Sequence, residues 1–488
     1  MASQTQEITI FSTGMTTDLR KVIRVNKKIL RPFQSLQHFD IYPDRLVPKR
    51  DWVLDTTATT NKLTRFTFFD DLSGYTLWGL GMSGTKALLQ KKTSPSLTAA
   101  WTSVSNGTTA GNVSSNPFLF GFAGYLYFMV NGGLGRYNVA SATLTEPWKT
   151  LSPVNVAKPV FHSRSGYAYF FFDDGVYRLD ASDNWVKVQV VPTGFYITSA
   201  RPAGNNLAIG CAPLNGYGDS FTYLWDLGET TLPAYNTFSE AIRWGRGKLL
   251  HLDYQLGVLV GVSNEQIDND ISVGKGRMVA GIYRGVTAQE ASYITADTTQ
   301  ATPIGTDDFS DAETLYFPAS MPFKGIVRTG IWSVNANGTF SIDAIGPSAE
   351  AGHQITGLYR WGKSWFVAFD DNNVYRTNDQ ASNTVAAIME TTVYGDRMNS
   401  SQFVGATISF EALTTGQSVT LKYKHPEDTS WTTMKSQSTV GQRQLQAIGT
   451  NLAQAPVFTE YQWRVESIGA IITGLAWTTE ANDQNIYG

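Results

Sequence analysis

The chain has 488 residues, of which 42% are hydrophobic, 12% aromatic and 16% charged, and it contains 44 glycines. This composition indicates an all-β fold and excludes a disordered or mainly helical chain, while the length allows two or three ordinary domains or one closed array of repeats. The formal net charge is −3, but it is unevenly distributed along the chain. No apolar run reaches the roughly 18–20 residues of a membrane helix, and the N-terminal segment lacks the order of a signal peptide. We therefore expect a soluble protein made in a cytoplasm. The single cysteine, Cys211, excludes an internal disulfide.

The first 62 residues are predicted to form an extended arm. Residues 20–50 contain nine Lys and Arg against two Asp, a net charge of +7, which leaves −10 for the rest of the chain. Pro32, Pro43 and Pro48 exclude a long helix here. Because apolar residues are interleaved with the bases, docking onto a protein surface is favoured over binding to nucleic-acid phosphates. The predicted assembly or docking residues are Arg20, Lys21, Arg24, Lys27, Lys28, Arg31, Phe33, Phe39, Tyr42, Arg45, Lys49 and Arg50.

From about residue 63 the sequence repeats with a period near 40 residues. Turn glycines precede short apolar runs at Gly124, Gly166, Gly204 and Gly247, at intervals of 42, 38 and 43 residues, and Gly362 lies 115 residues further on. Several short strands in each 40-residue period are typical of β-propeller blades. We predict a degenerate six- or seven-bladed β-propeller over residues 63–380; the alternative is a set of unrelated strand–turn–strand pieces from β-sandwiches.

The clearest repeat unit spans residues 161–188. Two aromatic and β-branched runs, 167–172 and 176–179, flank the turn Asp173-Asp174-Gly175, which predicts a β-hairpin with a buried aromatic layer. A similar unit with the pair Asp370-Asp371 occurs at 369–376. These carboxylate pairs resemble the acid and base of a glycosidase, but a pair repeated in two blades is better explained as turn scaffold.

After residue 380 the 40-residue rhythm stops. Residues 461–466 alternate apolar Tyr461, Trp463 and Val465 with polar neighbours, which is typical of a strand buried on one side. We predict a C-terminal β-sandwich over residues 381–488.

No residue cluster indicates a reaction. The five histidines are scattered and have no metal-binding spacing, and phosphate-loop, dinucleotide-binding and nucleophile-elbow motifs are absent from the sequence. Residues 307–311, with Asp307, Asp308 and Asp311, are predicted to be a solvated loop and not a calcium loop, because the turn glycine and the closing Glu are missing. We expect no catalytic residue, no metal and no cofactor, and therefore not an enzyme.

The arm motif FDIYPDRLVPKR at 39–50, the degenerate propeller and the C-terminal motif TEYQWRV at 459–465 together resemble virion structural proteins of tailed bacteriophages, especially the tail nozzle proteins of short-tailed phages. The resemblance covers the whole chain in layout. It implies a homo-oligomeric ring, with a hexamer favoured, at the lower end of the tail. It also implies partners among adaptor and fibre proteins, transient passage of phage DNA through the channel, and a location in the virion after synthesis in the host bacterial cytoplasm.

Two alternatives from other functional classes stay open. The many Tyr and Trp residues suit a carbohydrate-recognition propeller with an aromatic rim. A propeller glycoside hydrolase is the other, and it predicts two or three carboxylates that converge at the mouth of the propeller channel.

Overall fold

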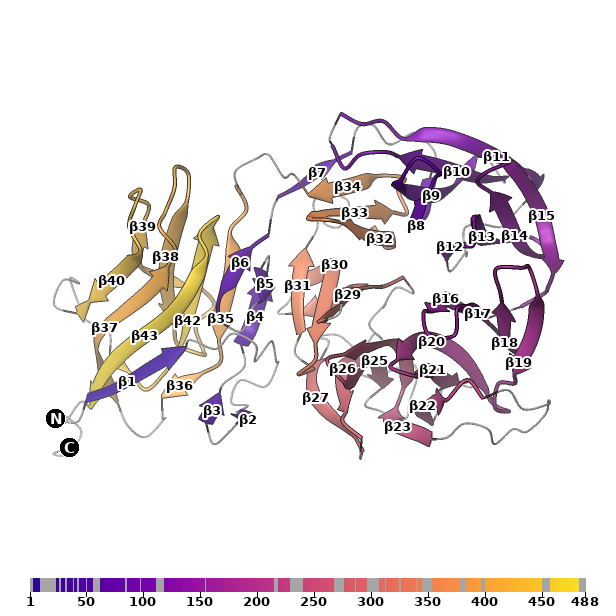
Figure 1. Cartoon of the computed structure of the whole chain (residues 1–488). Coiled ribbons are helices and arrows are strands. Elements are labelled where there is room, and N and C mark those ends of the chain that lie inside the picture. Colours follow the sequence, from indigo (N-terminus) through magenta and orange to yellow (C-terminus); the bar gives the residue numbers. More distant parts are fainter. Residues whose placement is uncertain are drawn as a thin grey trace. The chain divides into compact units, whose positions relative to one another are not determined.

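In the computed structural model the chain consists of β-strands connected by turns and loops (Figure 1). The described residues are 3–8, 23–25, 28–30, 33–37, 39–41, 44–49, 51–55, 62–83, 86–96, 98–110, 118–153, 155–214, 218–228, 240–266, 276–285, 287–295, 307–311, 313–323, 326–338, 340–344, 353–377, 383–395, 400–449 and 457–481. None of these stretches forms a helix long and apolar enough to span a bilayer. The chain divides into two compact units. The sandwich unit comprises Met1–Asp51, Thr339–Asp343 and Gln380–Gly488, and the propeller unit comprises Trp52–Gly338 and Ala344–Asp379.

Seven blades of the propeller unit, counted within the described residues, are arranged around a common axis (Figure 1); six are four-stranded sheets and one is part of a longer sheet. The first five are antiparallel four-stranded sheets whose strands follow sequence order. They are β8 (Lys62–Asp70), β9 (Tyr75–Ser83), β10 (Lys86–Lys92) and β11 (Thr102–Ala110); β12 (Leu119–Phe122), β13 (Tyr125–Val130), β14 (Gly133–Asn138) and β15 (Thr143–Thr150); β16 (Val156–His162), β17 (Tyr167–Phe172), β18 (Gly175–Leu179) and β19 (Trp185–Gln189); β20 (Phe195–Ala203), β21 (Asn206–Pro213), β22 (Asp219–Trp225) and β23 (Glu240–Arg246); and β24 (Lys248–Gln255), β25 (Val258–Gln266), β26 (Gly276–Tyr283) and β27 (Ala288–Thr295).

The last two blades depart from this pattern. The sixth begins with the two-residue strand β28 (Phe309–Ser310), followed by β29 (Thr314–Phe323) and β30 (Ile326–Asn335). The seventh contains β32 (Ile355–Trp361), β33 (Ser364–Phe369) and β34 (Val374–Thr377), and its outer strand is β7 (Trp52–Leu54). The sequence places residues 52–54 in the arm; in the structure they pair with β34 and join the last blade to the start of the first.

A buried ion pair ties this closing strand to the first blade. Asp55 follows β7, and its carboxylate lies 3.2 Å from Lys92 Nζ and accepts a 3.1 Å hydrogen bond from Trp101 Nε1. The side chains of Asp55 and Lys92 are completely buried. Burial lowers the pKa of Lys92, although Asp55 opposes that effect. The main-chain nitrogen of Asp55 donates to Val374 O in β34 over 2.8 Å, so one residue links the seventh blade to the first.

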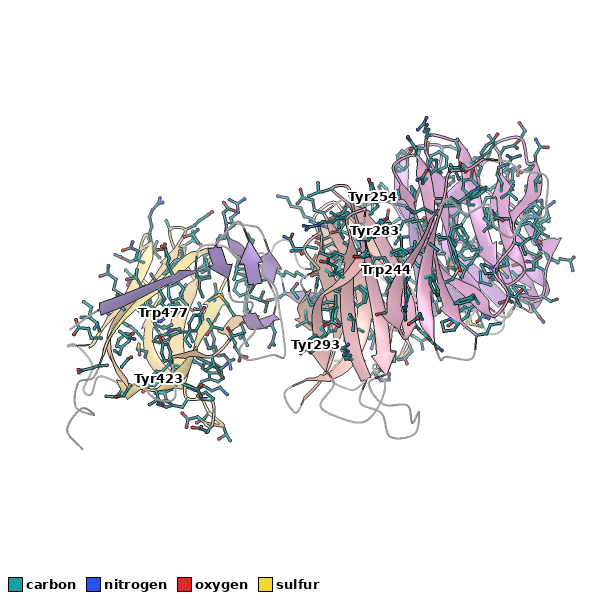
Figure 2. The ribbon with its side chains drawn as sticks, turned by 90° about the horizontal axis from the view of Figure 1, so that it is seen from below. Trp244, Tyr254, Tyr283, Tyr293, Tyr423 and Trp477 are labelled. Carbon is teal, nitrogen blue, oxygen red and sulfur yellow. The ribbon has the colours of Figure 1, made fainter. Side chains whose placement is uncertain are left out.

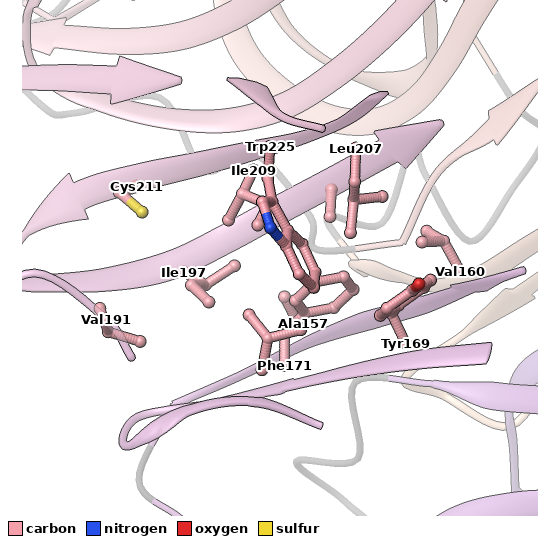
Figure 3. Packing of buried hydrophobic residues seen from close by; sticks show 12 residues of the cluster. Ala157, Val160, Tyr169, Phe171, Val191, Ile197, Leu207, Ile209, Cys211 and Trp225 are labelled. Atoms are coloured by element: carbon pink, nitrogen blue, oxygen red, sulfur yellow. The ribbon is translucent and has the colours of Figure 1, made fainter. Parts of the chain in front are cut away.

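Side chains fill both faces of each blade. Figure 2 shows Trp244 of the fourth blade and Tyr283 of the fifth, which pack in one hydrophobic cluster, with Tyr254 at one face of the propeller and Tyr293 toward the opposite face. The predicted aromatic hairpin is β17 and β18. Its residues Phe170 and Phe172 are buried with the second blade, while the alternating Tyr169 and Phe171 are buried with Trp225 and Ile209 of the fourth (Figure 3). Because β17 is buried on both sides, its aromatic run is longer than a one-sided strand would show.

The turn glycines confirm most of the predicted rhythm. Gly124, Gly166, Gly204 and Gly362 have positive φ angles of 82°, 72°, 65° and 61° and each precedes the second strand of its blade. Gly247, in contrast, precedes the first strand of the fifth blade, so it does not mark the equivalent turn. The equivalent residue is Gly257, 53 residues after Gly204. The strand β22 ends at Trp225 and β23 begins only at Glu240, and this longer separation in sequence shifts the rhythm.

The sandwich unit contains two antiparallel-rich sheets and confirms the predicted β-sandwich. Strands from the arm belong to both sheets, because they pair with C-terminal strands. One sheet contains β1 (Ser3–Ile8), β5 (Phe39–Ile41), β6 (Leu46–Pro48), β37 (Ser401–Phe410), β40 (Gln444–Ile448), β41 (Val457–Phe458) and β43 (Ile472–Ala481). The other contains β4 (Phe33–Gln37), β31 (Phe340–Ala344), β35 (Ala387–Thr391), β36 (Tyr394–Gly395), β38 (Ser418–Lys424), β39 (Thr432–Gln437) and β42 (Glu460–Ile468).

Aromatic residues from both sheets meet in the core of the sandwich. Trp463 of β42 lies 5.9 Å from Trp477 of β43 and 5.8 Å from Phe403 of β37, measured between ring centroids. Trp477 Nε1 donates a 2.8 Å hydrogen bond to the hydroxyl of Tyr461. The predicted inward residues Tyr461, Trp463 and Val465 are all buried. The alternation in this strand therefore identified one half of the core.

Candidate functional site

The most distinctive cluster of polar side chains lies on the axis of the propeller. The innermost strand of the sixth blade, β28, has only two residues, and the two residues before it, Asp307 and Asp308, are 2% and 4% exposed. Their partners come from the innermost strands of the third, fourth, fifth and seventh blades. Because these blades lie at different positions around the ring, a dipeptide that contacts all of them must lie near the axis.

Asp307 connects two blades that are not neighbours in the ring. Its Oδ1 atom accepts a hydrogen bond of 2.8 Å from Lys158 Nζ of β16, and its Oδ2 atom accepts one of 3.0 Å from the main-chain nitrogen of Leu358 in β32. The first strand of a blade has a free inner edge, which explains why the Leu358 nitrogen points to the axis. Arg65 of β8 is also close: burial lowers its pKa, and the charge of Asp307 offsets part of that shift.

Asp308 is held by charges from three neighbouring blades. One carboxylate oxygen accepts from Arg201 of β20, the other lies 3.1 Å from His251 Nδ1 of β24, and its main-chain oxygen accepts from Lys158 Nζ over 2.6 Å. Burial alone would raise the pKa of Asp308. Arg201, His251 and Lys158 outweigh burial and hold the pKa far below its ordinary value. Burial alone would lower the pKa of the Arg201 guanidinium, but the carboxylates around it outweigh burial and raise that pKa. Asp308 and Arg201 are thus both ionised throughout the physiological range.

A third carboxylate completes the axial cluster. Asp253 Oδ2 accepts hydrogen bonds from Ser310 Oγ over 2.6 Å and from Gln255 Nε2 over 2.8 Å, and its Oδ1 lies 3.8 Å from Arg201 Nε. Like Asp307 and Asp308, it is almost completely buried.

The geometry favours anchoring over acid–base chemistry. The propeller-hydrolase alternative predicts converging carboxylates, and Asp253, Asp307 and Asp308 do converge. A general acid, however, needs a carboxyl group whose pKa is raised toward neutrality, whereas that of Asp308 is lowered. Each of the three carboxylates already accepts hydrogen bonds from the protein. The cluster can hold the blades together and fill the axis.

The prediction of a solvated loop was wrong for Asp307 and Asp308. Only Asp311 is exposed, and it accepts a 2.9 Å hydrogen bond from Arg360 at the surface. The sequence did contain a signal for the axial cluster. The first strands of four blades carry a charged residue between mostly apolar neighbours, namely Arg65, Lys158, Arg201 and Asp253. A charged side chain on a strand that is otherwise buried indicates an oppositely charged partner inside the molecule.

The predicted docking residues of the arm are only partly described. Phe39 and Lys49 are buried within the sandwich unit, and Arg45 is exposed. Arg24, Lys28 and Phe33 lie on β2 (Ile23–Val25), β3 (Lys28–Leu30) and β4. The other six residues, Arg20, Lys21, Lys27, Arg31, Tyr42 and Arg50, fall outside the described residues.

The repeated carboxylate pairs have a shared structural role. Asp173 accepts hydrogen bonds of 2.9 and 3.0 Å from the main-chain nitrogen of Asn155, just before the first strand of the third blade. Asp370 accepts one of 3.3 Å from the equivalent nitrogen of Gln354 in the seventh blade. The interpretation of these residues as turn scaffold agrees with this geometry. The described residues contain no cluster of His, Cys, Asp or Glu suited to a metal ion.

One face of the propeller exposes apolar side chains. Tyr75, Phe161 and Tyr254 are 65%, 46% and 37% exposed and adjoin the turns between the first and second strands of the first, third and fifth blades. Leu72 and Leu256 in the same turns are also exposed and have positive φ angles of 76° and 49°. Positive φ is costly for a leucine, and such strain is often retained at binding surfaces. Sequence periodicity could not find these residues, because they lie at strand ends or in turns.

Comparisons with known proteins add little beyond the fold. No protein-family model and no curated protein matches the chain. Similar solved structures include virginiamycin B lyase from Staphylococcus aureus, at 12% identity over 67% of this chain and 98% of that chain, with a TM-score of 0.43. The N-terminal domain of Nup159 is 9% identical over 70% of this chain and 100% of that chain, with a TM-score of 0.41. BamB from Moraxella catarrhalis is 14% identical over 74% of this chain and 97% of that chain, with a TM-score of 0.37. At these scores the similarities carry no argument about activity, substrate or partner.

Proposed function

We propose that the protein is a non-enzymatic structural component of a bacteriophage tail, a nozzle or tail-tip ring that docks neighbouring tail proteins or fibres around the DNA exit channel. The observation that carries the proposal is the buried cluster of Asp307 and Asp308 near the axis of the propeller, which binds the inner strands of several blades. Propeller enzymes and binding proteins commonly use the axial opening for a ligand, but here Asp307 and Asp308 occupy it. A propeller with a filled axis is suited to act as a rigid block.

The layout of the chain supports a role in assembly. The propeller is inserted into the sandwich unit, whose sheets combine strands from both ends of the chain. Within the sandwich unit, the Asp51 carboxylate accepts hydrogen bonds from the nitrogens of Thr384 and Val385 over 2.7 and 3.2 Å and so ties the arm to the C-terminal segment. A force applied to either end of the chain would therefore act on strands that are hydrogen-bonded within a sheet. In this proposal DNA passes through the centre of the ring of copies and not through the axis of a single propeller.

The ring is tested by electron microscopy and native mass spectrometry of the purified full-length protein. We expect a closed ring of identical copies, as a heterologous interface that closes on itself requires, and we expect the protein among the components of purified virions. A lone monomer at high concentration, absent from particles, would refute the proposal.

Charge reversal sharpens this test. Arg45 is an exposed residue of the basic arm, so Arg45→Glu should weaken ring formation, and the effect should shrink at high salt because exposed charges are screened. Lys435→Glu, at an exposed position of β39, is the matched control and should leave the ring intact.

Carbohydrate recognition is the second candidate, favoured by the exposed rings of Tyr75, Phe161 and Tyr254 on one propeller face. Aromatic faces stack on sugars, and a receptor-binding tail protein would need such a surface. Glycan-array binding that is lost in Tyr75→Ala and Tyr254→Ala would support this function; an unchanged or absent signal would exclude it for this face.

A further inference from the structure

The N-terminal strand β1 covers one edge of β43 in the sandwich unit. All six of its residues are paired, from Ser3 opposite Glu480 to Ile8 opposite Leu475. The other edge of β43 pairs with β37. The strand β1 is therefore an edge addition that extends an existing sheet by main-chain hydrogen bonds.

The three described side chains of β1 add little to the core. Glu7 is exposed, while Gln6 and Ile8 are half-buried, and none of the three belongs to the buried core. The inward residues of the neighbouring strand, Leu475 and Trp477, are buried against the opposite sheet. The pairing with β43 that the structure describes is thus mainly a backbone contact, as in recognition by strand addition.

The edge of β43 that pairs with β1 needs a partner strand, because an exposed sheet edge tends to pair with other chains. Without β1, residues 475–480 of β43 would present unpaired main-chain groups, and such an edge readily pairs with another chain. The β1 strand of a second copy offers the same hydrogen bonds as the strand of the same copy. Fourteen residues, 9–22, connect β1 to β2. Their fully extended length is at most about 50 Å, several times the radius of gyration of roughly 15 Å for a unit of this size.

We propose that β1 is exchanged between copies, so that the β1 strand of one chain covers the β43 edge of the next. This inference rests on the ring proposed above and names the segment that links its members. Each copy donates one strand and accepts one, which is the arrangement that a closed head-to-tail ring needs. The partner of this surface is a second copy of this chain.

Engineered disulfides test the exchange directly. Glu7 and Ala476 lie opposite each other, and paired antiparallel residues have Cα separations of about 4.5–5.5 Å, within the disulfide range. Chains with Glu7→Cys and chains with Ala476→Cys, carrying different tags, are co-produced, assembled, oxidised and run on a non-reducing gel. If β1 is exchanged, the two single variants form a disulfide-linked heterodimer. A chain that carries both substitutions then gives a ladder of linked copies.

The native cysteine does not compete in this experiment, because Cys211 is buried. The matched control uses Ser409→Cys and Gln444→Cys, which lie opposite each other on β37 and β40 in the interior of one chain. As separate chains these should give no heterodimer. If the Glu7 and Ala476 variants also give none, and the double variant links only within its own chain, the exchange is refuted. Rings seen by electron microscopy in that case would leave the proposed function standing.

Discussion

Two strands from the first 54 residues, β7 and β1, pair with strands far away in sequence, and they are attached in very different ways. The short β7 is followed by Asp55, whose buried carboxylate binds Lys92 and Trp101. The longer β1 relies on main-chain pairing with β43 and contributes nothing described to the core. The number of paired residues therefore does not measure how firmly a strand is held. Buried side-chain partners determine how much stability the strand contributes, because the loss of one partner leaves an uncompensated charge.

Removal of the Asp55 charge should have the largest effect. Asp55→Asn leaves Lys92 buried without its counter-charge, which should cost about 3–5 kcal/mol of stability. Denaturant unfolding of the variant and the wild type measures this difference. The control is Asp174→Asn, which breaks an exposed pair with Lys187 and should cost less than about 1 kcal/mol. Equal effects of the two substitutions would contradict the account of ring closure.

The axial cluster should make stability depend on pH. The pKa of Asp308 is lower in the folded protein than in the unfolded chain, where it is about 3.9. The unfolded chain therefore binds the proton first as the pH falls, and the stabilisation is complete above about pH 5 and declines below about pH 4. Asp308→Asn should be less stable than wild type at pH 7, and the gap should narrow at pH 3. A gap that is constant between pH 7 and pH 3 would refute the ionised cluster.

A milder change addresses the core of the sandwich unit. Trp477→Phe keeps most of the ring but removes the hydrogen bond to Tyr461, which should cost about 1–3 kcal/mol. The effect should appear in unfolding of the sandwich unit, followed by the fluorescence of the remaining tryptophans. The substitution should leave the pH dependence from Asp308 unchanged, and an altered pH dependence would show that the two cores are coupled.

The smallest effect is expected from deletion of residues 1–8. Because β1 adds no described core residue, its loss should lower the melting temperature of the sandwich unit less than Trp477→Phe does. The same deletion should abolish linkage between copies if β1 is exchanged. A collapse of the sandwich unit would show instead that β1 is an integral part of its fold.

Much of the architecture was predictable because it is repeated or alternating. Turn glycines such as Gly124 and Gly166, and the alternation around Trp463, reflect local geometry that sequence periodicity records directly. The closure by β7 was not predictable in this way, since three residues carry no periodic signal. Nor was the axial position of Asp307 and Asp308, because an acidic loop is normally solvated unless cations from distant strands surround it.

We propose that the protein works as a rigid member of a closed ring and that Asp307 and Asp308 fill the axis of each propeller. Electron cryo-microscopy of the purified full-length protein tests it most directly. The account predicts a closed ring of copies with continuous density across each propeller axis at Asp307 and Asp308. Isolated single chains with an open axis would contradict it.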